Sequence, residues 1–152
     1  MNAKAFLSDI SKLDIMIENK LSEKAHWRSV AYNVTPQPET VKINGIVHVM
    51  DKVQSSGNPH KMEDAIAKCV DLEKEIDQHI DLLIDKRKEV LRVIEQLNAT
   101  EYDVLHKIYF QYKTLQDVAD KYNRTYSWAT TIHGRALKNV QNILDEMEGA
   151  AQ

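Results

Sequence analysis

A group of hydroxyl and basic side chains near the end of the chain has the spacing and chemistry of a nucleic-acid contact. The group consists of Tyr126, Ser127, Thr130, Thr131, Arg135 and Lys138. Residues three or four positions apart lie on the same side of an α-helix. Hydroxyl groups hydrogen-bond to base edges and phosphates, and arginine and lysine neutralise phosphates. The pattern therefore predicts a helix, starting at Tyr126, that places one face in the major groove of DNA.

The charge distribution around these residues supports the same prediction. The whole chain has a formal net charge of −3, which gives it no general attraction to nucleic acid. From Lys121 to Leu144, however, the sequence contains lysine, arginine and His133 but neither aspartate nor glutamate. Any DNA contact is thus expected to be local to this run. The alternative is a plain bundle of helices in which the same polar face meets only water.

Three helices are expected to position this face. The first starts near Thr100, and the second follows Thr114, whose hydroxyl can cap it together with Asp117 three residues later. Asn123 is expected at the next turn, because asparagine tolerates a left-handed backbone better than other non-glycine residues. Thr125 then caps the third helix. The faces predicted to pack together comprise Tyr102, Leu105, Ile108, Tyr109, Leu115, Val118, Ala119, Tyr122, Ala129, Ile132, Ala136, Leu137 and Val140.

This part of the chain resembles region 4 of bacterial sigma factors, which reads an upstream promoter element. The resemblance rests on the stretch YFQYKTLQDVADKYNRTYSWATTIHGRALKNV, residues 109–140. It implies a helix-turn-helix in which Tyr126, Ser127, Thr130 and Thr131 read bases. Phosphate contacts would come from Arg124, Arg135 and Lys138, and Thr114 matches the threonine or serine cap that begins the first helix of the pair.

Sigma recognition helices are usually arginine-rich at their start, whereas this one has Tyr126, Trp128 and Thr130. Trp128 is predicted either to stack on a base or to pack against the first helix of the unit.

Two longer helices are predicted before this unit, over residues 3–31 and 60–97. The second has apolar residues at alternating spacings of four and three, a heptad pattern typical of coiled coils. Its stripe comprises Met62, Ile66, Cys69, Ile76, Ile80, Leu83, Val90, Ile94 and Leu97. We expect the two helices to form an antiparallel hairpin, with a second copy of the protein covering the rest. Glu73 and Arg87 interrupt the stripe, and they either pair between chains or extend into solvent.

Residues 32–60 interrupt the helical pattern. Pro36 and Pro38 end the first helix. The pair Asn44-Gly45 favours a two-residue hairpin turn within residues 41–49, although a loop is equally compatible with the imperfect alternation there. Ser56 or Asn58 could cap the next helix, with Pro59 in its first turn.

The arrangement of the whole chain resembles a family of short phage and prophage proteins from Gram-positive hosts. The segments that carry this resemblance are ISKLDIMIENKL, the stretch starting VQSSGNPHKMEDAIAKC, and the C-terminal unit. Some related proteins are late-gene regulators of the RinA and ArpU type. The resemblance implies an all-α chain with an oligomerising helical hairpin in residues 1–97 and a DNA-binding domain in residues 98–152, with a possible small β-hairpin insert at 41–49.

The sequence offers little that would support catalysis. Its six histidines have no metal-ligand spacing with each other or with the single cysteine, Cys69, and we expect neither a metal site nor another cofactor. Cys69 lies in the apolar stripe, where packing is a better explanation than nucleophilic chemistry. A lone cysteine excludes an intramolecular disulfide, and no apolar run is long enough to span a bilayer. We therefore expect a non-enzymatic protein of the bacterial cytoplasm.

The function predicted from these patterns is sequence-specific binding of double-stranded DNA by a homodimer that regulates phage or prophage transcription. Two other functions stay open. A small terminase-like packaging protein also joins a helix-turn-helix to an oligomerising helical segment. A protein that mimics sigma region 4 would bind host RNA polymerase, with or without contacting DNA itself.

Overall fold

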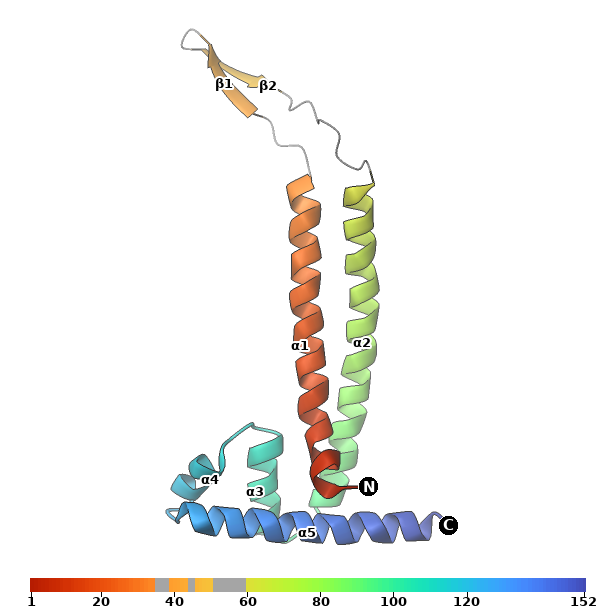
Figure 1. Ribbon diagram of the computed structural model, residues 1–152, viewed down its shortest axis with the longest axis vertical. Helices are drawn as coiled ribbons and strands as arrows, with labels where there is room; N and C mark the ends of the chain where they lie inside the picture. Colours follow the sequence, from red (N-terminus) through yellow and green to blue (C-terminus); the bar gives the residue numbers. More distant parts are fainter. Residues whose placement is uncertain (35–38, 44–45, 51–59) are drawn as a thin grey trace. The chain divides into compact units, whose positions relative to one another are not determined.

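The computed structural model describes residues 1–34, 39–43, 46–50 and 60–152, which are predominantly helical (Figure 1). The helices are α1 (Ala3–Val34), α2 (Lys61–Ile94), α3 (Ala99–Tyr109), α4 (Leu115–Lys121) and α5 (Tyr126–Ala150), and the strands are β1 (Glu39–Ile43) and β2 (Ile46–Met50). The chain divides into two compact units. Unit 1 contains Met1–Met16 and His79–Gln152, and unit 2 contains Ile17–Gln78.

Unit 1 has a main apolar core that joins both ends of the chain. The buried side chains come from the start of α1, the end of α2, and from α3 and α5. They are Ala3, Phe6, Leu7, Ile10, Val90, Val93, Ile94, Leu105, Phe110, Ala136, Val140 and Leu144. This core contains residues from both sides of the boundary between 97 and 98 that the sequence suggests, because the apolar ends of α1 and α2 are covered by α3 and α5.

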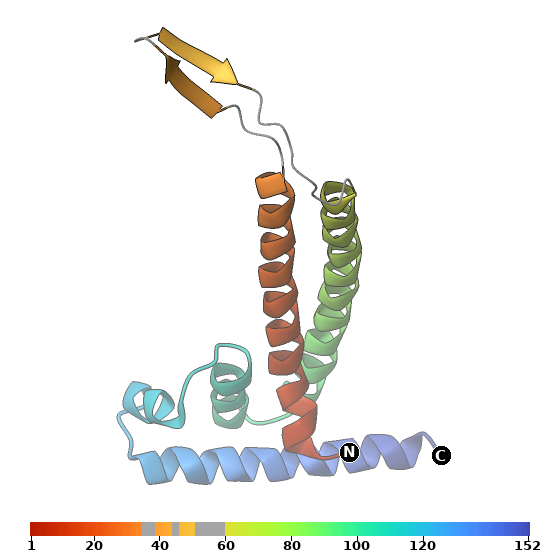
Figure 2. The same cartoon turned by 45° about the horizontal axis from the view of Figure 1, so that its top comes forward.

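A second, smaller apolar cluster in unit 1 holds the three C-terminal helices together. Val104 of α3, Val118 of α4 and Ile132 of α5 are buried in it, and Ile108, Tyr122 and Trp128 pack around them. Two views of the ribbon show α3 and α4 on the same side of α5 (Figures 1 and 2). The Trp128 ring lies against the Tyr122 ring, with 5.1 Å between their centroids. Trp128 is thus a packing residue, one of the two roles that its position suggests.

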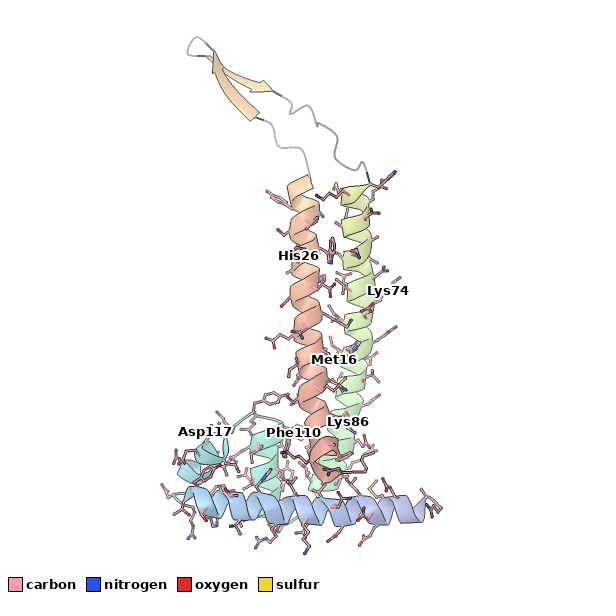
Figure 3. The ribbon with its side chains drawn as sticks, viewed as in Figure 1. Met16, His26, Lys74, Lys86, Phe110 and Asp117 are labelled. Atoms are coloured by element: carbon pink, nitrogen blue, oxygen red, sulfur yellow. The ribbon has the colours of Figure 1, made fainter. Side chains whose placement is uncertain are left out.

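Helix α4 begins directly after Thr114, as the sequence predicts. The Thr114 hydroxyl accepts a hydrogen bond from the Asp117 amide at 3.1 Å, and the Asp117 carboxylate accepts one from the Thr114 amide at 2.9 Å. This capping box satisfies two amides that a helix start otherwise leaves unpaired. Asp117 is seen at the beginning of α4 in Figure 3.

The turn after α4 is a Schellman motif centred on Asn123. The Asn123 backbone is left-handed, with φ of 51°. The Asn123 amide donates to the carbonyl of Asp120 at 3.1 Å, and the Arg124 amide donates to that of Ala119 at 2.9 Å. These bonds satisfy two carbonyls that the helix end leaves open. Thr125 then caps α5, because its hydroxyl accepts from the Trp128 amide at 3.1 Å. The predicted roles of Asn123 and Thr125 are both confirmed.

The two charged residues that interrupt the α2 heptad stripe find partners on α1 of the same chain. In unit 2, the Glu73 carboxylate lies 2.7 Å from the Lys24 ammonium. In unit 1, Arg87 lies 3.9 Å from the Asp14 carboxylate, and its guanidinium stands over the Phe110 ring at 5.1 Å. Pairing between chains is therefore not needed to explain either residue.

The heptad stripe itself does not form a single buried seam. In unit 2 the buried residues of α2 are Ala65, Leu72 and Ile76, whereas Met62 and Ile66 are 40% and 46% exposed. Of the predicted stripe, Ile80 in unit 1 is also exposed, at 38%. A 3.6-residue helix drifts relative to a seven-residue repeat, so one straight partner cannot cover the whole stripe. Met62, Ile66 and Ile80 are thus among the stripe residues that one chain leaves exposed, and their expected cover by a second copy stays a prediction.

Strands β1 and β2 pair antiparallel within residues 39–50. Glu39 lies opposite Met50, and Ile43 lies opposite Ile46. Of the ribbon and the loop that the sequence left open for residues 41–49, the structure has the ribbon. The Asn44-Gly45 turn and the predicted cap at Ser56 or Asn58 lie outside the described residues.

The left-handed backbone at Asn123 gives a direct test of the turn. Replacing Asn123 by alanine should lower the free energy of unfolding by about 1 kcal/mol, because a Cβ without a polar group disfavours this conformation. Replacing it by glycine should leave stability unchanged or slightly raise it. Urea unfolding followed by circular dichroism measures both. Equal midpoints for the asparagine and alanine proteins would contradict the assignment.

Candidate nucleic-acid interface

One face of α5 is exposed along the residues that the sequence singles out. Tyr126 is 54% exposed, and Ser127, Thr130, Thr131 and Lys138 are also exposed. The opposite face of the helix is buried through Ala129, Ile132, Ala136 and Val140. The two faces follow the 3.6-residue period, so the packing of the buried face fixes which side chains point outward. The structure thus brings six of the eight predicted contact residues onto the exposed surface of α5, these five and Arg135.

The hydroxyls of Thr130 and Thr131 are already engaged with the helix backbone. Thr130 Oγ1 donates to the carbonyl of Tyr126 at 3.0 Å, and Thr131 Oγ1 donates to the carbonyl of Ser127 at 2.9 Å. Such bonds to the preceding turn fix the threonine rotamer. Each side chain therefore presents a methyl group and oxygen lone pairs in a defined arrangement.

The two predicted contacts outside α5 lie at the ends of α4. Thr114 is exposed, but its hydroxyl oxygen accepts the hydrogen bond that caps α4. Its role in the structure is therefore to begin this helix, whether or not it also contacts DNA. Arg124 is exposed, and its amide completes the Schellman motif. No carboxylate partner of Arg124 or Lys138 lies in the described part of the chain. Both cations are therefore available to phosphates.

Arg135 differs from the other predicted contacts because it holds the fold together. Its Nε donates to Glu101 Oε1 at 2.7 Å, and Asn139 Nδ2 donates to the other carboxylate oxygen at 2.9 Å. Glu101 is only 1% exposed, whereas the Arg135 side chain is 55% exposed. The Glu101 carboxylate of α3 is thus held by two residues of α5. Because Nε is bonded to Glu101, a phosphate contact by Arg135 has to use the other two nitrogens of its guanidinium.

The environment of Glu101 keeps it ionised. Burial acts to raise the pKa of this carboxyl, but hydrogen bonds from Asn139 and Arg135 and the Arg135 charge together lower it below its ordinary value. The buried group is therefore a carboxylate at neutral pH. Because an isolated buried charge is very costly, its two α5 partners are required rather than incidental.

A second carboxylate on α3 secures α4. Asp103 accepts a hydrogen bond from the Tyr122 hydroxyl and pairs with Lys107, which is 6% exposed. Burial, together with the bond to Asp103, raises the pKa of Tyr122 to about 12. Burial would raise the pKa of Asp103, but Lys107 and Tyr122 lower it. The tyrosine thus remains a neutral donor to a charged acceptor, a strong form of hydrogen bond.

His133 adds no positive charge to the interface at neutral pH. It is half-buried, and burial together with nearby Lys4 lowers its pKa. Its Nε2 lies 3.2 Å from the Tyr109 hydroxyl, and the two rings stack. In the acid-free run the cations that remain are those of lysine and arginine.

Sequence patterns did not point to Glu101 or Asp103 as functional residues. A signal for Glu101 is present, since it precedes Leu105 by four residues and so falls on the apolar face of α3. A charged residue on such a face requires a buried partner. The partners themselves, Arg135 and Asn139, are more than thirty residues away in the sequence.

The Glu101 network predicts a dependence of stability on pH. Because the pKa of Glu101 is lower in the folded protein, its contribution is present above the ordinary value of 4.5 and is lost as the pH falls through the lowered pKa. Glu101→Gln should therefore melt below the wild type at neutral pH, and the difference should shrink as the pH drops below about 4.5. Thermal melts followed by circular dichroism at a series of pH values measure this.

The exposed Glu95 supplies the matched control, because its carboxyl has no described partner. Glu95→Gln should follow the wild-type melting curve at every pH. A constant offset between Glu101→Gln and wild type over the whole pH range would contradict the role given to the charge of Glu101.

Neither a metal site nor a membrane-spanning helix is found in the described residues. Within residues 1–34, 39–43, 46–50 and 60–152, no group of three or more histidine, cysteine, aspartate or glutamate side chains is arranged to hold a metal ion. No helix in the described ranges combines the length and apolarity needed to cross a bilayer.

Comparison with known proteins identifies one family. No curated protein and no solved structure matches the chain. A family model described as a protein of unknown function, DUF1492, matches residues 44–143. This match covers most of the chain, including α2, α3, α4 and the greater part of α5. The chain therefore belongs to the DUF1492 family.

Proposed function

We propose that this protein binds double-stranded DNA in a sequence-specific manner and regulates transcription. In this proposal α4, the turn at Asn123 and α5 act as a helix-turn-helix, with α5 in the major groove. The observation that carries it is the exposed face of α5 from Tyr126 to Lys138, within a run that lacks acids up to Leu144. It presents Tyr126, Ser127, Thr130 and Thr131 for bases and Lys138 for a phosphate. The helix caps and the hydrogen bonds of Asp103 and Glu101 fix the orientation of this face relative to α3.

The packing of α4 and α5 supports this proposal over that of a passive bundle. A bundle needs only apolar contacts between helices, yet α4 and α5 are also fixed by a capping box, a Schellman motif and two carboxylate networks. Recognition of bases requires side chains held to within about half an ångström of the correct geometry. The exposed residues at the start of α5 contribute nothing to the apolar clusters, so their types are free to serve a ligand.

We further propose that the protein acts as a homodimer through an antiparallel hairpin of α1 and α2. In unit 2, Met62, Ile66 and Val70 are each at least 40% exposed on α2. A second copy could cover these residues and place two α5 helices on half-sites about 34 Å apart. The likeness to phage regulators suggests phage or prophage promoters as the targets. Sedimentation equilibrium tests the dimer, and a strictly monomeric chain at micromolar concentration would exclude it.

Selection of bound fragments from sheared phage or host DNA tests the function directly. Enrichment of a few intergenic sites, weakening steeply with salt, is the expected result. Sites beside packaging genes together with a large ring in native mass spectrometry would indicate a packaging protein instead. Absence of any enrichment at low salt would reject DNA binding and direct attention to RNA polymerase as the partner.

Two cations of the interface predict a measurable salt effect. Arg124→Ala and Lys138→Ala should each weaken binding to a short duplex of mixed sequence and reduce the slope of log affinity against log salt by about 0.9 for each copy of the chain bound. Fluorescence anisotropy at several salt concentrations measures the slope. Neither exposed residue has an ion-pair partner in the described part of the chain, so the melting temperature should not change.

Lys88→Ala is the control for this pair, because Lys88 is exposed on α2 and has no described ion-pair partner. It should retain the wild-type slope. Arg135→Ala is unsuitable as a probe of DNA contact, since it leaves the buried Glu101 short of a partner and should cost about 1–3 kcal/mol of stability. Equal slopes for Lys88→Ala and Lys138→Ala would contradict the assignment of Lys138.

Gly134 allows a steric test of the same face. It lies between Thr131 and Lys138 on α5, and a Cβ built there meets no atom within 4 Å. Gly134→Leu should therefore stabilise the fold by roughly 0.5–1 kcal/mol, because glycine is unfavourable inside a helix. The added side chain would occupy space between α5 and DNA, so affinity should fall at least tenfold.

Gly149 is the matched control for Gly134, since it lies near the other end of α5 and its Cβ position is equally open. Gly149→Leu should fold as well as the wild type and keep its DNA affinity. If Gly134→Leu bound DNA as tightly as Gly149→Leu, this face of α5 could not lie in the groove.

A further inference from the structure

The hydrogen bonds of two adjacent threonines restrict what α5 can recognise. The Thr130 hydroxyl donates its hydrogen to the backbone carbonyl of Tyr126 at 3.0 Å, and the Thr131 hydroxyl donates its hydrogen to that of Ser127 at 2.9 Å. A hydroxyl has a single hydrogen, so neither side chain retains a donor for a ligand in this arrangement. Both residues are exposed, and each therefore offers a methyl group and acceptor lone pairs to whatever approaches the helix.

The neighbouring residues add few donors to this part of the surface. Residues 126–133 contain no arginine, lysine, asparagine or glutamine, the residue types that make bidentate contacts with guanine or adenine. His133 is half-buried against Tyr109, and Trp128 is packed in the smaller apolar cluster. Arg135 comes later, and its Nε is committed to Glu101. The two threonines thus contribute methyl groups and acceptors, and the hydroxyl donors of Tyr126 and Ser127 lie one turn earlier on the helix.

This chemistry matches one kind of base pair. In the major groove both kinds of base pair present an amino donor, on adenine N6 or cytosine N4, but only an A·T pair also presents a methyl group, that of thymine. We propose that Thr130 and Thr131 select A·T pairs, with their methyl groups against thymine methyls and their hydroxyl oxygens accepting from adenine N6. This inference rests on the proposed DNA binding and adds the identity of the bases.

The first step of the test is selection of tightly bound duplexes from a random pool by the wild-type protein. The selected sites should contain A·T pairs at the centre of each half-site. Thymines in the selected duplex are then replaced one at a time by uracil, which differs only in lacking the methyl group. At the contacted positions affinity should fall about fourfold, which corresponds to roughly 0.8 kcal/mol for one buried methyl group. A contacted thymine·adenine pair is also replaced by 5-methylcytosine·guanine or by cytosine·guanine. The duplex with 5-methylcytosine should bind more tightly than the duplex with unmethylated cytosine.

Two variants of Thr131 separate the methyl contact from the hydrogen bond. Thr131→Ser keeps the hydroxyl but lacks the methyl group, so it should bind the thymine and uracil duplexes equally at one position. Thr131→Val keeps a methyl group but lacks the oxygen. It should still discriminate between thymine and uracil, yet be indifferent to replacing the partner adenine by purine, which lacks the amino group. The corresponding Thr130 variants should act at a neighbouring pair.

The outcomes separate this inference from the proposed function. Failure of the wild type to bind any duplex at low salt would overturn both. Tight binding to sites with G·C centres, or equal affinity for thymine and uracil at every position, would overturn the inference alone and leave DNA binding intact. Because both threonine side chains are exposed, the melting temperatures of the four variants should equal that of the wild type. Differences in affinity then report base recognition and not an altered fold.

Discussion

The buried carboxylate of Glu101 is the interaction on which the C-terminal half of unit 1 depends. It is 1% exposed, and both of its oxygens are bound by α5, through Arg135 and Asn139. Asp103, two residues later on α3, points to another side of the helix and binds Tyr122 at the end of α4. One short helix thus holds its two neighbours by separate charges. Apolar packing alone permits helices to slide and rotate, whereas hydrogen bonds to a fixed carboxylate permit one register.

This arrangement separates the residues that make the fold from those that would contact DNA in the proposed function. The caps at Thr114 and Thr125 and the left-handed turn at Asn123 determine where α4 and α5 begin and end. Ser127, Thr130, Thr131 and Lys138 take no part in the apolar clusters. Arg135 is the exception, because it combines an exposed guanidinium with a bond to Glu101. A loss of DNA binding on its replacement would therefore not distinguish an altered fold from a lost contact.

The features that the sequence predicts well are those with local causes. A helix cap needs residues three positions apart, and a left-handed turn needs a residue that tolerates it, so Thr114, Thr125 and Asn123 could be assigned without a structure. The exposed face of α5 follows from the periodicity of its buried residues. The network around Glu101 could not be assigned, because its partners are distant in sequence and only tertiary packing brings them together.

The uneven burial of the α2 stripe has a related physical cause. A heptad pattern records which residues are apolar, but not which of several partners covers each of them. In unit 1 the end of α2 is buried through Val90, Val93 and Ile94 by α3 and α5 as well as α1. In unit 2, which α3 and α5 are not part of, Met62, Ile66 and Val70 remain exposed. The same stripe therefore has two different environments along one helix.

The modest charge of the α5 face bears on how the proposed DNA binding could reach useful affinity. Arg124 and Lys138 supply few phosphate contacts, His133 is neutral, and methyl contacts contribute mainly to discrimination between bases. A single copy of this surface would bind DNA weakly. Joining two copies makes the second contact intramolecular, with an effective concentration in the millimolar range for short connections. In the proposed dimer, a second copy would cover the exposed apolar residues of unit 2 and would supply a second α5, which a weakly charged DNA-binding helix requires.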